Sequence, residues 1–185
     1  FPQAGAVQEG ASTAPGYFVQ QLQRTSLGWS ETWVRWRTTR PVPGGGRPTN
    51  NPIMGHDEAA LKGVLAYIEK YGPYDGLYGF SQGAAVVTAL SKPGVAEGCG
   101  SKRTWRFVIC ACGVPPPGDG RVNLPSLQIS GTRDPFLSAS RALAGVYEAP
   151  VLLEHAVGHE LPLKLRHDPR FKDALDAFFD RVLQL

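Results

Sequence analysis

The residues best suited to chemistry centre on Ser81, which stands between two glycines in the segment Gly79-Phe80-Ser81-Gln82-Gly83. A serine hydroxyl becomes a useful nucleophile only when a general base takes its proton and nearby donors hold the charge that forms on the attacked carbonyl. Glycines at these two positions let a strand pass into a helix through a strained turn that exposes the serine. The backbone N–H of Gln82, at the start of that helix, would then point at the oxyanion. The segment therefore predicts a nucleophile with one oxyanion donor beside it.

An acid and a histidine follow Ser81 in the order that such a site requires. Asp134 comes directly after a short apolar run at residues 127–130, and His159 comes a few residues after another at 151–154. Loops at the carboxyl ends of parallel strands meet at one edge of a sheet, so both side chains should converge on the serine. In that arrangement His159 would take the serine proton, and Asp134 would fix the imidazole tautomer and stabilise its charged form.

Each of these residues also has a structural interpretation. Ser81 could be a turn serine that caps the following helix, and Asp134 before a proline is a common turn-initiating pair. His155 competes with His159, because it lies closer to the end of its strand; the place of His159 after a glycine in the loop favours the latter. The two other histidines, His56 and His167, are interpreted as surface residues.

The elements that must position these side chains alternate between helix and strand. An amphipathic stripe at residues 61–68 predicts a helix that stops at Gly72-Pro73. Strands are expected at 76–80, 105–112, 127–130 and 151–154, and further helices at 81–90, 138–147 and 171–182. The run at 105–112 lacks clean alternation, as expected of a strand buried on both faces. The pattern predicts an α/β domain over residues 1–185, with an open, mostly parallel sheet covered by helices on both sides.

The first 52 residues show little clear periodicity and many turn formers, so we expect them to be irregular and loop-rich. Tryptophans and arginines are interleaved here: Trp29, Trp33, Trp36, Arg35, Arg37 and Arg40. Such a pattern could stack nucleic-acid bases. Because no wider basic patch accompanies it, packing of a long loop against the domain is the preferred interpretation.

Composition narrows the class of protein. A formal charge of +3 with scattered basic residues gives no case for a nucleic-acid or anionic-membrane partner, and no apolar stretch approaches the roughly 18 residues of a membrane span. The N-terminus also lacks a signal-peptide pattern. Three cysteines do not make a disulfide framework; they are interpreted as buried packing residues in a reducing compartment, such as the cytoplasm or an organelle matrix or stroma. Cys110 and Cys112 lack two further ligands for zinc, so we expect no metal.

With these residues in hand, the chain resembles the FSH family of serine hydrolases, small α/β-hydrolases related to carboxylesterases and acyl thioesterases. The resemblance covers nearly the whole chain from about Tyr71, and its most specific parts are YGPYDGLYGFSQGAAVVTAL, RFVICACG, SLQISGTRDPFL and VLLEHAVGHELP. It implies the α/β-hydrolase fold, the hydrolysis of esters or thioesters of short to medium acyl chains, a triad of Ser81, Asp134 and His159, and no cofactor.

The chain departs from the family at its beginning. Members open with a strand that ends in a Leu-His-Gly-like turn, whose following loop supplies the second oxyanion N–H, and no such turn is present here. Phe1-Pro2 resembles the stretch just after the family's second strand, so roughly 40 to 50 residues of the usual domain are expected upstream. Such a segment, or a neighbouring chain, would complete the sheet. The alternative to an active hydrolase is a catalytically silent hydrolase-like fold that serves as a structural or interaction subunit.

Overall fold

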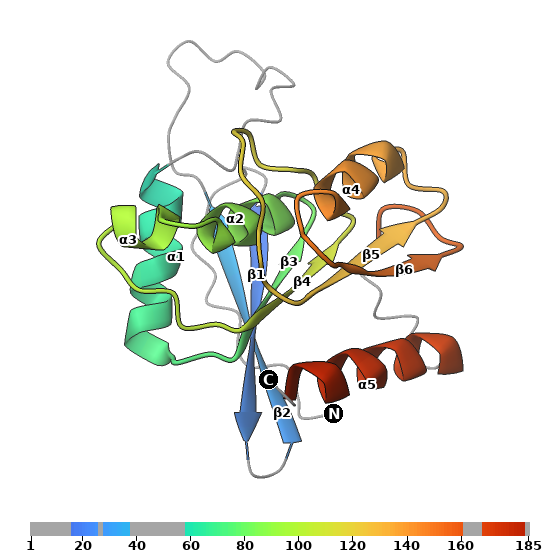
Figure 1. Cartoon of the computed structure of the whole chain (residues 1–185), viewed down its shortest axis with the longest axis horizontal. Coiled ribbons are helices and arrows are strands. Elements are labelled where there is room, and N and C mark those ends of the chain that lie inside the picture. Colours follow the sequence, from blue (N-terminus) through green and yellow to red (C-terminus); the bar gives the residue numbers. More distant parts are fainter. Residues whose placement is uncertain (1–15, 26–27, 38–57, 161–167, 184–185) are drawn as a thin grey trace.

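The computed structural model describes residues 16–25, 28–37, 58–160 and 168–183, which form a six-stranded sheet with helices on both faces (Figure 1). The strand order is β2-β1-β3-β4-β5-β6. The strands are β1 (Gly16–Thr25), β2 (Gly28–Arg37), β3 (Gly76–Phe80), β4 (Phe107–Ala111), β5 (Ser126–Gly131) and β6 (Val151–His155). The helices are α1 (Glu58–Tyr71), α2 (Gln82–Ser91), α3 (Val95–Gly98), α4 (Leu137–Ala144) and α5 (Pro169–Leu183).

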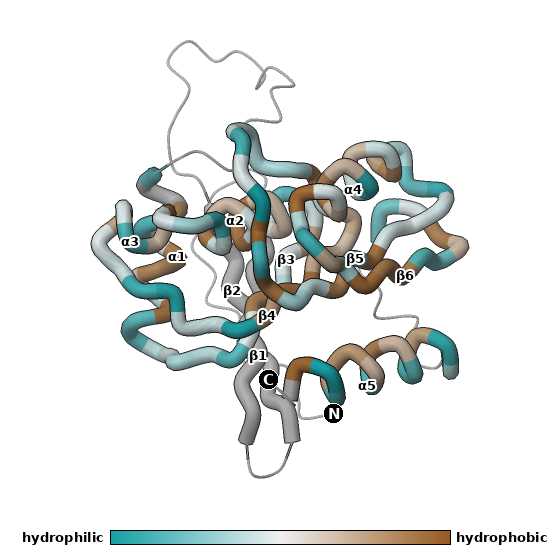
Figure 2. Tube along the Cα trace, in the orientation of Figure 1, coloured by the Kyte–Doolittle hydropathy of each residue, from teal (hydrophilic) through white to brown (hydrophobic). Residues whose placement is uncertain are grey.

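The four strands β3 to β6 are parallel neighbours, and alternate side chains of β4 point into two separate cores. Val108 and Cys110 pack with α1 and α2 on one face, whereas Phe107 and Ile109 pack with α5 on the other. Figure 1 shows α1, α2 and α4 on one side of the sheet and α5 on the opposite side. A strand that is apolar on both faces reads as a continuous hydrophobic run. These strands accordingly carry much of the brown, hydrophobic colour in Figure 2.

The predicted α/β architecture is confirmed, since every strand and helix expected after residue 57 is present with small differences at its ends. The short helix α3 was not predicted. Helix α2 occupies a central place: every residue from Gly83 to Ser91 is buried, which explains its run of alanines, valines and other small side chains. It starts directly after Ser81, so the position of the predicted nucleophile is fixed by a helix packed deep in the molecule.

The prediction that residues 1–52 are irregular is wrong over two ranges, because β1 and β2 form an antiparallel hairpin. The three tryptophans therefore lie in a strand, and not in a loop; Arg40, together with residues 1–15, 26–27 and 38–52, lies outside the described part of the chain. Strand β1 pairs antiparallel with β3, with Phe18 opposite Phe80 and Leu22 opposite Gly76. Strand β1 thus pairs with the side of β3 that is opposite β4.

The register of the hairpin also fixes its direction. Gly16 pairs with Arg37, so both ends of the hairpin lie beyond Phe80, at the carboxyl end of β3. Thr25 and Gly28, which pair at the other end of the hairpin, lie beyond Gly76, at the amino end of β3.

The described helices include none that is both long and apolar enough to cross a bilayer. Cys99, Cys110 and Cys112 are free thiols. Cys110 and Cys112 are buried as predicted, whereas Cys99 is partly exposed at the margin of the core. The compartment in which the protein resides stays a prediction.

Candidate active site

Ser81 occupies a strained turn between β3 and α2. Its φ of 55° lies in the region that side chains rarely adopt, with ψ at −118°. Its N–H donates to the carbonyl oxygen of Ala111 at 2.9 Å, which ties the turn to the end of β4. Residues held in such conformations are concentrated at functional sites, where the surrounding structure enforces them. The local geometry is that of a nucleophile elbow.

Gly79 allows this turn because no side chain fits at its position. A Cβ there would lie 2.5 Å from the carbonyl oxygen of Gly83 and 2.6 Å from the backbone N and Cα of Ala84. Real Cβ atoms do not approach backbone atoms so closely. The first glycine of the motif therefore lets β3 pack directly against the first turn of α2.

Replacing Gly79 with alanine should accordingly lower the free energy of unfolding by about 1–3 kcal/mol, because the backbone of α2 would have to move. Gly98→Ala is the matched control, since a Cβ at Gly98 meets nothing within 4 Å. Urea unfolding of both variants measures the difference. Equal stability of Gly79→Ala and wild type would contradict the packing described above.

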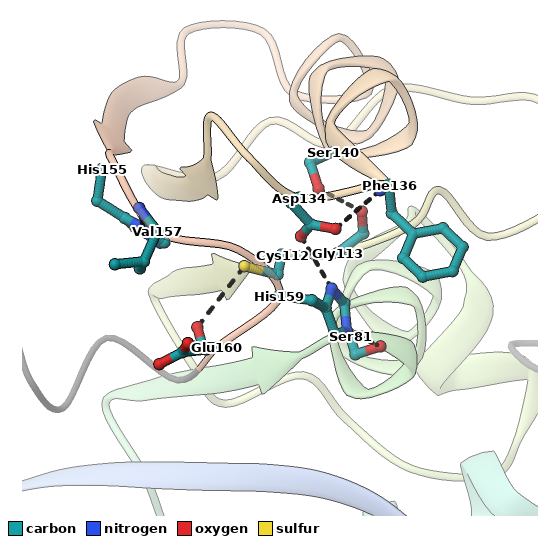
Figure 3. A network of polar contacts seen from close by, with 10 residues as sticks. All are labelled: Ser81, Cys112, Gly113, Asp134, Phe136, Ser140, His155, Val157, His159 and Glu160. Atoms are coloured by element: carbon teal, nitrogen blue, oxygen red, sulfur yellow. Dashed lines mark hydrogen bonds and ion pairs between the residues drawn. The ribbon is translucent and has the colours of Figure 1, made fainter.

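Ser81, His159 and Asp134 are joined in one chain of hydrogen bonds (Figure 3). The Oγ of Ser81 lies 3.0 Å from Nε2 of His159, and Nδ1 of the same imidazole lies 2.8 Å from Oδ2 of Asp134. Although Ser81 is the N-cap residue of α2, its side chain makes no capping hydrogen bond. Ser81 therefore stands at the N-cap position, but its side chain bonds His159 instead of capping the helix.

The carboxylate of Asp134 is buried and held from two sides. Its Oδ1 accepts a hydrogen bond from the backbone N–H of Phe136 at 2.8 Å, while Oδ2 faces His159. Burial by itself would raise the pKa of Asp134, but the N–H of Phe136, the imidazole and the Cys112 thiol together hold this pKa below its ordinary value. Asp134 also has the turn role that its place before a proline suggested, because its carbonyl oxygen accepts the N–H of Leu137 at 3.0 Å.

An ionised Asp134 fixes the tautomer of the imidazole. A carboxylate only accepts hydrogen bonds, so Nδ1 of His159 must carry the proton that is shared with Oδ2. The lone pair of Nε2 is then free to accept the hydroxyl proton of Ser81. This is the protonation pattern of a general base next to a nucleophile.

His155, the competing histidine, lies elsewhere. It is buried at the end of β6, and its Nδ1 accepts the N–H of Val157 at 3.4 Å. Burial lowers the pKa of His155, which favours the neutral form. Figure 3 shows His155 on the far side of the site from Ser81. The structure thus brings His159, and not His155, to the serine; His56 and His167 lie outside the described residues.

Gln82, the predicted oxyanion donor, is the first residue of α2. The N–H groups of the first turn of a helix have no acceptor within the helix, and they carry the positive end of the helix dipole. The backbone N–H of Gln82 thus directly follows Ser81, the predicted nucleophile. Its role, and that of a second donor, stay predictions.

Cys112 is a member of the site that sequence reasoning interpreted only as packing. It follows β4 with a φ of 47°, and its thiol donates to the carbonyl oxygen of Glu160 at 3.7 Å. Burial and the neighbouring Asp134 raise the pKa of Cys112 to about 11, so the thiol stays protonated. The signal that could have found it is its place at the carboxyl end of a strand next to β3, since such ends share one edge of the sheet.

In the described part of the chain, one group of potential metal ligands stands out: atoms of Cys112, Asp134 and His159 lie within 4.8 Å of one another. The hydrogen bond between Nδ1 of His159 and Oδ2 of Asp134 already uses one potential ligand atom of each of these two residues. The arrangement therefore fits proton transfer better than ion coordination.

A family model described as Serine hydrolase (FSH1) matches residues 2–170. The chain belongs to this serine hydrolase family. Among curated relatives of this FSH1 member, Esterase OVCA2 of Bos taurus is 33% identical over 136 residues, which are 66% of this chain and 58% of that protein. Esterase OVCA2 of Homo sapiens is 31% identical over 133 residues, 65% of this chain and 57% of that protein. The chain thus spans less than two thirds of the length of the relatives it matches.

Solved structures with the same architecture support the fold of the FSH1 member. The carboxylesterase of Bacillus cereus has a TM-score of 0.53 and 14% identity, covering 83% of this chain and 76% of that one. The type II thioesterase BorB from the borrelidin biosynthetic cluster has a TM-score of 0.53 and 13% identity, covering 83% of this chain and 80% of that one. At such low identity the likeness concerns the α/β-hydrolase fold alone.

Proposed function

We propose that this member of the serine hydrolase family cleaves carboxylic esters or acyl thioesters through an acyl-enzyme formed on Ser81. The observation that carries the proposal is a pair of hydrogen bonds through one imidazole. They join Ser81 Oγ to His159 Nε2 at 3.0 Å and His159 Nδ1 to Asp134 Oδ2 at 2.8 Å. Family membership and relatives named as esterases support the same class of reaction.

The geometry fits a two-step reaction. In the first step Nε2 of His159 takes the hydroxyl proton as Ser81 Oγ attacks the carbonyl carbon, and the N–H of Gln82 stabilises the oxyanion. The imidazolium then gives its proton to the departing alcohol or thiol as the bond to the carbonyl carbon breaks. In the second step water attacks the acyl-enzyme with the same histidine as base, which releases the acid and restores Ser81.

A fluorophosphonate probe tests the proposal, because it reacts with activated serine nucleophiles. The full-length protein should be labelled on the peptide that contains Ser81, and Ser81→Ala should not be labelled. Ser101→Ala is the matched control: this serine lies in the loop after α3, and its loss should leave labelling intact. Equal labelling of wild type and Ser81→Ala, or none of either, would instead support a catalytically silent fold.

A further inference from the structure

Two aromatic rings flank the imidazole of His159. The ring centroid of Phe80 lies 5.0 Å from that of His159, and the centroid of Phe136 lies 5.3 Å away in an edge-on arrangement. Phe80 directly precedes Ser81, and Phe136 follows Asp134 by two residues. Both rings are therefore carried by the same turns that position the nucleophile and the acid.

The Phe136 side chain is exposed even though its backbone is fixed. Its exposed fraction is 51%, and it belongs to neither hydrophobic core, whereas Phe80 packs against the core on the α5 side. The hydrogen bond that Phe136 makes to Asp134 comes from its backbone N–H, so the acid does not need the ring. In Figure 3 the ring projects beside His159, on the opposite side from Cys112 and Glu160.

Other large hydrophobic residues exposed in the described part of the chain have no such neighbour. Tyr71 lies at the end of α1, where it contacts Tyr67 and Lys70, and Leu152 lies on the edge strand β6. A single exposed apolar residue is ordinary at a protein surface. Phe136 differs in lying against the group that exchanges protons with the substrate.

The position of His159 determines which part of a substrate would contact the Phe136 ring. On the proposed function, Nε2 of His159 must come within hydrogen-bond distance of the leaving oxygen or sulfur to protonate it. The chain attached to that atom leaves the carbonyl carbon on the histidine side, whereas the acyl chain extends away from it. We infer that Phe136 is a specificity-determining residue that packs against an apolar alcohol or thiol leaving group. The preferred substrates are then esters or thioesters whose leaving group carries several methylenes.

A pair of isomeric esters separates the two sides of the substrate. Hexyl acetate places six carbons on the alcohol, and ethyl hexanoate has the same formula but places them on the acyl group. Phe136→Ala should lower the ratio of kcat/KM for hexyl acetate to that for ethyl hexanoate by about tenfold, as expected for the loss of roughly two methylene contacts. Phe136→Leu, which keeps an apolar side chain, should recover much of this ratio.

Leu152→Ala is the matched control for removal of an exposed apolar side chain, and it should leave the ratio unchanged. An unchanged ratio in Phe136→Ala would overturn the inference, and so would an equal loss for both esters or a selective loss for ethyl hexanoate. Failure of the proposed function is distinct from these results: wild type would then hydrolyse neither ester and would not react with the fluorophosphonate probe.

Discussion

Replacing His159 with glutamine should lower kcat for ester hydrolysis by about 10⁴- to 10⁶-fold, the range found when the base of a serine triad is removed. Nε2 of this residue lies 3.0 Å from Ser81 Oγ, and no other described histidine is in reach of the hydroxyl. A glutamine side chain has similar length but no group that can take the serine proton and return it.

His155→Gln is the matched control, since it removes a histidine four residues away that lies off the reaction path. Its kcat should stay within a few-fold of that of wild type, whereas its stability can change because the site is buried. Steady-state kinetics on folded protein, checked by circular dichroism, measures both variants. A large loss in His155→Gln with activity retained in His159→Gln would reverse the assignment of the base.

Replacing Asp134 with asparagine should lower kcat by about 10⁴-fold while leaving the fold intact. The reason lies in the two hydrogen bonds of the carboxylate. The N–H of Phe136 donates to Oδ1, so an asparagine would place its amide oxygen there and turn its NH₂ toward Nδ1 of His159. The imidazole would then carry its proton on Nε2, where it cannot accept the hydroxyl proton of Ser81.

The control for this substitution is Asp119→Asn, which alters an exposed aspartate in the loop before β5 and should leave kcat unchanged.

A second measurement follows the stability of the protein as the pH is lowered. Since the folded protein holds the pKa of Asp134 below its ordinary value, this carboxylate stabilises the fold fully above about pH 4, the pKa of an unfolded aspartate. That contribution is lost as the pH falls through the lower folded pKa. Asp134→Asn should lack this part of the acid-induced loss of stability; an unchanged kcat in this variant would remove Asp134 from the mechanism.

The parallel part of the fold could be predicted from the sequence because its strands are buried on both faces. Runs such as residues 105–112 are apolar throughout, and the stripe at residues 61–68 has a clear helical period. The hairpin of β1 and β2 was missed, although its aromatic and β-branched residues and the two-residue gap between its strands are signals of such a structure. Glutamines and arginines lie between these residues, so the segment shows no clear hydrophobic period. The pairing of β1 with β3 is a tertiary contact that no local pattern encodes.

The predicted site residues could be chosen from their order along the chain and their places after strands. The choice between His155 and His159 rested on loop position alone. The structure now separates them, because His159 Nε2 lies 3.0 Å from Ser81 Oγ, whereas His155 Nδ1 accepts the N–H of Val157. The hydrogen bond from Phe136 could not be predicted, because its N–H reaches the carboxylate only through the turn at Asp134. Cys112 could be placed near the site from its position after β4, but its positive φ, which is unusual for its side chain, could not be predicted.

The direction of the hairpin bears on how proteins of this kind can diverge. Gly16 and Arg37 lie together beyond Phe80, so the chain enters and leaves the hairpin at the edge of the sheet that carries Ser81. Changes of length or sequence next to Gly16 or Arg37 would therefore act at the same edge of the sheet as Ser81, and they would not interrupt the ladders of β3 to β6. On the proposed function, these are two positions at which evolution or a protein engineer could vary the chain at that edge without redesigning the sheet that holds the predicted triad in place.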